Sequence, residues 1–438
     1  MDQTPLFMQL LRKTGIFPVI SILALTCLSF HNQPNPGKSL SNLVYNDHIY
    51  NDNVKTVKLY NQNSNPGAVM DAPYTSLQQN SPFMLEFDVL NEDAYYYQAK
   101  VIQCNWDWTP SQLNAIEYMD TYNEIDYESY NYSIDTKIPY THYRFIIPAL
   151  KLSGNYLVYV YDRDDPDRII LSRRLMIYDN KVQISPEVTL SNGISERTTN
   201  QQINFTLAYP SLQVMNPIQD FKVVIRQNYS WFNDITGLKP TQVNQVQKIL
   251  QYNHFNLENN FGGGNEYRYF DMRSAVSPGI NIDHISTKAE RIDAFLGIDK
   301  SRAAMAYGQW HDMDGAYYAS SIDQEDVSTE ANYIYTHFFL QTGTKLPSDV
   351  YIFGEISFRQ PLPQYKMKYD SNLGGYTGDF ILKEGYYDYI YITPGNQYLL
   401  EGNHFETENT YDIIVYYRAP SKIYDQIAGY IQFKSNNH

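Results

Sequence analysis

Four acidic residues lie close together where a calcium-binding loop could form. Asp162, Asp164, Asp165 and Asp167 supply the carboxylate oxygens that Ca²⁺ prefers, at partly alternating positions. A calcium loop also needs a glycine for its sharp turn, and this segment has Pro166 instead. Because Asp and Pro are themselves turn residues, we interpret the segment as a solvated hairpin turn.

Three further patterns offer metal or phosphate chemistry only in part. Residues 311–315, His-Asp-Met-Asp-Gly, hold two carboxylates, but the Asp-Gly pair is typical of a tight turn. The nine histidines show neither the spacing of a zinc helix nor a partner cysteine, so no metal site is predicted. Residues 262–265, Gly-Gly-Gly-Asn, lack the Lys-Ser/Thr pair of a phosphate loop, and we interpret them as a flexible turn.

Two tryptophans could form a binding surface, and three arginines form a local basic cluster. Trp106 and Trp108 end a predicted strand two positions apart, where both could stack on a sugar ring. A tryptophan at the end of a sandwich strand more often covers the core, and we favour that interpretation. Arg168, Arg173 and Arg174 form the most noticeable basic cluster, which is predicted to be a solvated face.

None of these residues forms a converging set of nucleophile, base and stabilising donors. A carboxylate pair for glycoside hydrolysis depends on spatial separation, and nothing in the sequence nominates one. We therefore predict that the protein is not an enzyme, that it has no catalytic, cofactor-binding or metal-binding residue, and that it uses no cofactor. Its partner-binding residues are unknown at this stage, so the function must be sought in surfaces.

The composition indicates an exported all-β protein. The chain has 438 residues, 42 of them Tyr, many in short alternating runs, and tyrosine favours pleated, half-buried surfaces. Charged residues make up only 18% of the sequence, and the net charge of −15 argues against nucleic acid or anionic lipid as a partner.

The N-terminus has the pattern of a secretory signal. Arg12 and Lys13 precede an apolar stretch that is too short to span a membrane comfortably, so residues 1–30 are predicted to be a removed signal peptide. Cys27 could be lipidated, although plain cleavage is favoured. Removal of the signal peptide takes Cys27 away and leaves Cys104 as the remaining cysteine, so no internal disulfide can form.

Strand periodicity divides the rest of the chain. Residues 31–53 are predicted to be a flexible arm and residues 54–180 an immunoglobulin-like sandwich. Residues 181–340 are expected to form a second, irregular β domain with a long polar loop at 274–332, which includes a short helix at 288–296. Val350–Glu355, Met367 and Lys383–Tyr389 resemble early-set β-sandwiches, and this resemblance implies a C-terminal early-set-like sandwich at residues 341–438. The predicted fold is thus two or three tandem immunoglobulin-like or early-set β-sandwich domains with long loops.

Short segments spread in order along the chain resemble the plug protein family of the type IX secretion system. They are Tyr95–Tyr97, Cys104–Ser111, Tyr140–Tyr143, Ser153–Tyr156, Ser172–Met176, Arg226–Asn228 with Trp231, Asn265–Asp271, Leu382–Tyr389, Glu401–Gly402 and Glu406–Tyr411. The resemblance implies a periplasmic, non-enzymatic β-rich protein at the inner face of the outer membrane. It implies that the protein docks against a giant outer-membrane translocon barrel, associates with the membrane through that partner, and closes the pore when no cargo passes.

Two rival functions stay open at this point. A carbohydrate-binding β-sandwich protein for glycan capture would stack Trp106, Trp108 or the C-terminal tyrosines on sugar rings. A hydrolase would use an unrecognised carboxylate pair.

Overall fold

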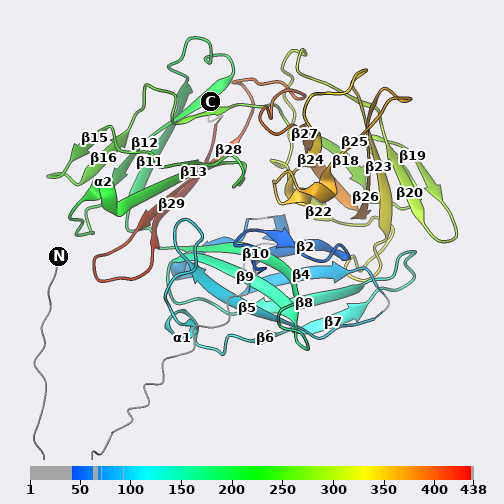
Figure 1. Cartoon of the computed structure of the whole chain (residues 1–438), viewed down its shortest axis with the longest axis horizontal. Coiled ribbons are helices and arrows are strands. Elements are labelled where there is room, and N and C mark those ends of the chain that lie inside the picture. The colour runs from blue at the N-terminus through cyan, green and yellow to red at the C-terminus, as the bar shows by residue number, and fades with distance from the viewer. Residues whose placement is uncertain (1–41, 63–67, 71, 92, 436–438) are drawn as a thin grey trace, which may run out of the picture. The chain divides into compact units, whose positions relative to one another are not determined.

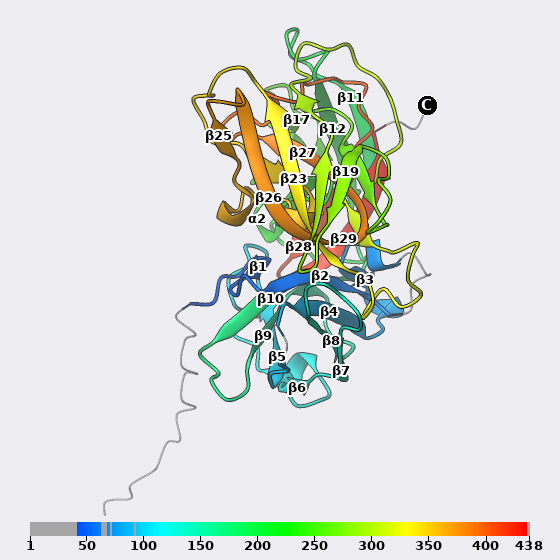
Figure 2. The ribbon, with the colours of Figure 1, turned by 90° about the vertical axis from the view of Figure 1, so that its right-hand side faces the viewer.

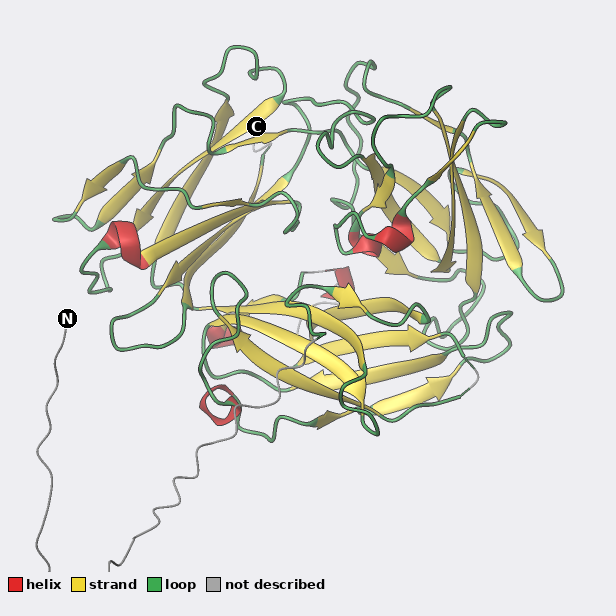
Figure 3. Ribbon diagram, in the orientation of Figure 1, coloured by secondary structure: helices red, strands yellow, loops and turns green. Residues whose placement is uncertain are grey.

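The computed structural model describes residues 42–62, 68–70, 72–91 and 93–435, and residues 42–438 form one compact unit. The predicted signal peptide, Cys27 and residues 31–41 of the predicted arm lie outside the described residues. Nearly every described element is a strand, which confirms the all-β prediction (Figure 3). In the part of the chain that the structure describes, no helix has the length and apolar character needed to cross a membrane.

The first module is a sandwich of two sheets (Figure 2). One sheet has the order β2 (Val54–Asn61), β4 (Phe83–Val89), β8 (Thr141–Ile147), β7 (Ser129–Tyr132). The facing sheet contains β10 (Ile169–Tyr178), β9 (Gly154–Asp162), β5 (Tyr97–Cys104) and β6 (Ile125–Asp126), with β1 (His48–Ile49) and β3 (Tyr74–Ser76) beside β10. Short helices are η1 (Ala68–Met70), η2 (Leu77–Gln79) and α1 (Ala115–Tyr118). Side chains of β5 alternate between buried and half-buried, as one core-facing side requires.

The second module is built from two separate parts of the chain (Figure 1). One sheet contains β11 (Gln183–Leu190), β12 (Asn200–Ala208), β16 (Ile249–Tyr252), β15 (Gln242–Asn244) and β17 (Asn260–Gly262). The other contains β14 (Ile235–Thr236), β13 (Phe221–Gln227), β28 (Thr410–Tyr417) and β29 (Gln426–Lys434), and α2 spans Pro217–Asp220. The latter sheet continues into the first module, because β29 pairs with β10 through Ile427 and Tyr178.

The third module lies between those two parts in sequence. One group of strands is β18 (Arg268–Met272), β27 (Gly385–Ile392), β22 (Tyr317–Ala319) and β24 (Tyr351–Phe353). The other is β19 (Ile282–Thr287), β20 (Ile292–Leu296), β23 (Tyr333–Gln341), β26 (Gly375–Lys383), β25 (Lys368–Asp370) and β21 (Asp299–Lys300). The 3-10 helices η3 (Glu355–Ser357) and η4 (Pro363–Tyr365) follow β24. One hydrophobic core joins the two groups of strands.

This arrangement differs from the prediction, which placed the boundary between the second and third domains at residues 340 and 341. The core of the second module combines residues 182–261 with residues 411–428, and the core of the third spans 270–400. The reason is that β28 pairs along its length with β13, far upstream, while strand periodicity reports only local structure.

Three local predictions are also wrong. The segment 274–332 contains β19, β20 and β22, and the predicted helix at 288–296 is occupied by β20. The helical spacing of apolar residues there is overridden because β20 pairs with β19 on one side and β23 on the other. Residues 42–53 of the predicted arm are also structured, since β1 pairs with β10.

Buried charges join the third module to the first. Lys383 donates to Asp88 at 2.8 Å, and Tyr333 Oη donates to the same carboxylate at 2.6 Å. Lys58 forms a second ion pair with Glu355, with 2.7 Å between Nζ and Oε1. Because buried charges need partners, these contacts fix how the two modules meet.

Candidate functional site

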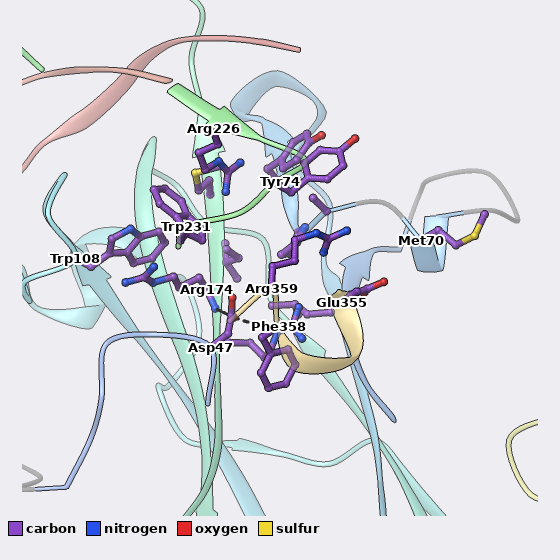
Figure 4. A pocket seen from close by; sticks show the side chains of 17 residues that line it. Asp47, Met70, Tyr74, Trp108, Arg174, Arg226, Trp231, Glu355, Phe358 and Arg359 are labelled. Atoms are coloured by element: carbon purple, nitrogen blue, oxygen red, sulfur yellow. Dashed lines mark hydrogen bonds and ion pairs between the residues drawn. The ribbon is translucent and has the colours of Figure 1, made fainter. Parts of the chain in front are cut away.

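Arginine and tryptophan side chains from all three modules gather at one junction (Figure 4). The first module supplies Arg173 and Arg174 from β10 and Trp108 from the turn after β5. The second module contributes Arg226 from β13 and Tyr229 and Trp231 from the segment that follows it. The third module contributes Glu355 from η3 and Phe358 and Arg359 from the turn after it. We call this group the junction.

Guanidinium groups stack on the aromatic rings of the junction. The Arg174 guanidinium lies 4.2 Å from the Trp108 ring centre and 5.2 Å from that of Trp231. Arg226 lies 4.3 Å from the Trp231 ring centre, and the two tryptophans meet edge to face at 5.2 Å. Each desolvated cation–π contact of this kind contributes about 1–2 kcal/mol, so the stack stabilises the contact between modules.

Ion pairs neutralise part of this charge. Arg226 holds Asp412 through two hydrogen bonds of 2.9 and 2.5 Å, and their side chains are only 4% and 1% exposed. Asp47 lies 3.2 Å from Arg173 Nε. Burial lowers the pKa of Lys58 to about 8, against the opposing attraction of Glu355.

The junction encloses a small cavity of about 60 Å³. Binding sites for drug-sized molecules measure about 300–1,000 Å³, so this one does not fit a sugar. Trp108 is 5% exposed and packs in the core, as the favoured interpretation expected.

The prediction of a solvated arginine face is wrong for Arg173, which is 6% exposed. Arg173 and Arg174 are adjacent in β10, so they point to opposite faces of the strand. The prediction failed because other modules cover β10. Of the other junction residues, Arg226 and Trp231 entered the sequence analysis only as family markers, and Arg359 gave no signal.

The turn at 311–315 lies against the buried carboxyl of Asp388 in β27. Asp314 and Gly315 form the expected tight turn with φ values of 52° and 78°. Asp312 Oδ2 accepts a hydrogen bond from the Tyr267 amide, and Asp388 Oδ2 accepts one from the Met313 amide, each at 2.5 Å. Burial raises the pKa of Asp312 to about 8 and that of Asp388 to about 7. Both carboxyls thus hold backbone amides in place, which is a structural role.

The remaining candidate sites are structural as well. Asp162 accepts from the Asp164 amide within the hairpin turn. Within the described ranges, no group of three or more His, Cys, Asp or Glu side chains is placed to hold a metal ion. The glycine run at 262–264 is not a flexible turn, because a Cβ on Gly263 would lie 1.9 Å from the His404 carbonyl oxygen. Two backbones approach closely there, and only glycine fits.

The outer edge of β7 carries exposed aromatic side chains of the first module. Tyr130 and Tyr132 are 39% and 49% exposed, and the Tyr130 ring meets those of Tyr127 and Tyr132 edge to face at 5.5 and 5.7 Å. Among the described strands, β7 pairs only with β8. Natural edge strands avoid added pairing by being short or by carrying Lys, Pro or bulges; β7 has only four residues, but its sequence Ser-Tyr-Asn-Tyr has neither Lys nor Pro. We call this strand with its tyrosines the tyrosine edge, and it is able to accept an added strand.

Comparisons with known proteins identify the first module. Residues 54–179 match the family model described as "Type 9 secretion system plug protein 1st domain". A crystal structure of a hypothetical protein from Parabacteroides merdae is similar over 90% of this chain and 100% of that chain, with 28% identity and a TM-score of 0.83. No curated protein matches the chain. The resemblance to the plug family of the type IX secretion system is thereby confirmed, and it rests on the first module.

Proposed function

We propose that this protein is a non-enzymatic component of the type IX secretion machinery that binds the periplasmic side of the outer-membrane translocon and closes its pore in the absence of cargo. The match of residues 54–179 to the plug-protein domain carries this proposal. The proposal also places the protein in the periplasm, exported by the predicted signal peptide. The tyrosine edge supports it further, because tyrosine is enriched in protein interfaces.

Affinity purification from native outer membranes in mild detergent tests the interaction. We expect a very large barrel protein to co-purify with the wild type. Tyr132→Lys adds a charge to the tyrosine edge and is expected to reduce the recovered barrel, whereas Tyr122→Lys, at a 78% exposed tyrosine outside β7, is the matched control. Absence of the barrel from the wild-type sample would refute the proposed function. If Tyr132→Lys recovers as much barrel protein as the wild type, the tyrosine edge is not the contact surface, and the proposed function itself is not refuted.

Carbohydrate binding is a second candidate function, and a cavity in the third module favours it. A hollow of about 250 Å³ in the third module is lined by Tyr269, Asn281, Asp299, Arg302 and Trp310 among others. Aromatic and polar side chains together are suited to a sugar ring, and the volume approaches that of known ligand pockets. Glycan-array binding that disappears with Trp310→Ala but persists with Tyr122→Ala would support this role, and an array without any signal would eliminate it.

A further inference from the structure

Three buried N–H donors that line the junction cavity have no hydrogen-bond partner among the described residues. They are Nε1 of Trp108, Nε of Arg173 and Nε of Arg359. Nε of Arg173 lies 3.2 Å from an Asp47 oxygen, but outside hydrogen-bonding geometry. Buried donors in folded proteins are nearly always paired, so three in one cavity point to an acceptor bound there.

The charge of the cavity wall favours a negative acceptor. Arg226 is paired with Asp412, and Glu355 is paired with Lys58. In contrast, the side chains of two other lining arginines donate only to backbone carbonyls. These are Arg174, which donates to Tyr45 O, and Arg359, which donates to Asp314 O.

Two carboxyl groups interact electrostatically with these arginines without a hydrogen bond to them. Asp234 interacts electrostatically with Arg226 and Arg174, and Asp314 with Lys434 and Arg359, and burial raises the pKa of both carboxyl groups. Guanidinium and indole N–H groups donate without accepting, so the three unpaired donors require an acceptor.

We infer that the junction cavity binds a small anion of the carboxylate or phosphate class. The volume of about 60 Å³ has room for about four water-sized groups, which matches a small oxyanion and excludes a nucleotide. Its donors come from the first and third modules, while Arg226 and Trp231 of the second module complete the wall. The anion therefore joins the first and third modules beside the wall that the second module completes, and this inference does not depend on the proposed function.

Thermal unfolding of the full chain in sodium phosphate, sodium acetate and sodium chloride, at constant ionic strength and pH, measures the binding. We expect Tm to rise with phosphate or acetate and to saturate, because a ligand that binds only the folded state stabilises it by mass action. Arg359→Gln and Trp108→Phe each remove one donor, and we expect Arg359→Gln to weaken the affinity by about tenfold or more. Arg168→Gln, whose side chain is 51% exposed and outside the cavity, is the matched control and keeps the wild-type response.

A selenate-soaked crystal of the wild type locates the anion directly, because selenate is a tetrahedral oxyanion like phosphate and scatters anomalously. We expect an anomalous peak in the cavity, with selenate oxygens within hydrogen-bonding distance of Trp108 Nε1 and Arg359 Nε. A Tm that rises no more with phosphate or acetate than with chloride, or a cavity that holds only water in the soaked crystal, would overturn the inference. The crystal decides the question even where Arg359→Gln or Trp108→Phe fails to fold.

Discussion

Removing one partner of the buried Arg226–Asp412 pair should destabilise the protein strongly. Both side chains are at most 4% exposed and are joined by two hydrogen bonds, so Arg226→Met leaves the Asp412 carboxylate buried without its counter-charge. Breaking such a pair costs about 3–5 kcal/mol. Loss of the cation–π contact with Trp231 adds about 1 kcal/mol. We expect the free energy of unfolding to fall by about 4–6 kcal/mol, the sum of these two contributions.

Urea denaturation of the single and double variants tests this reasoning. Asp412→Leu should cost about as much as Arg226→Met, since it leaves the guanidinium unpaired. The double variant Arg226→Met/Asp412→Leu buries no charge and should recover most of the loss, remaining within about 2 kcal/mol of the wild type. Arg168→Met removes an exposed arginine that pairs with Asp162, and should cost less than about 1 kcal/mol. A double variant as unstable as the sum of its single variants would refute the electrostatic account and indicate a packing effect.

Three further variants test other contacts. Asp388→Asn removes a carboxyl whose pKa is raised to about 7 in the folded protein, whereas the same carboxyl in the unfolded chain releases its proton near pH 4. The stability of the wild type therefore falls as pH rises between about 4 and 7. The variant should gain Tm relative to the wild type at about pH 8 but not at about pH 5. Gly263→Ala places a Cβ against a backbone carbonyl and should cost about 1–3 kcal/mol in urea denaturation, while Gly308→Ala, which has no contact under 4.0 Å, should be near neutral. Asp88→Ala leaves Lys383 buried without its carboxylate and should lower stability by about 3–5 kcal/mol, and a loss below about 1 kcal/mol would show that this ion pair does not join the modules.

The strands were predictable from sequence because their signal is local. In β5 the residues from Tyr97 to Cys104 alternate as a half-buried strand must, and the Asp-Gly turn at 314–315 forms where its dipeptide predicts. The segment of β20 shows the limit of such signals, since its helical spacing lost to pairing with two neighbouring strands.

The junction was not predictable for a different reason. Arg174, Arg226 and Arg359 approach one another only after β28 and β29 return to the second module and the third module folds between them. No periodicity or motif records contacts between residues so far apart in the chain. The family markers did include Arg226 and Trp231, and their role as stacked partners became visible only in the structure.

Outer-membrane permeability to large antibiotics tests the central claim most directly. If the protein closes the translocon pore, deletion of its gene should sensitise cells to antibiotics too large for ordinary porins, and expression of the wild-type chain should restore resistance. Unchanged sensitivity in the deletion strain, with no second copy of such a gene present, would contradict the account.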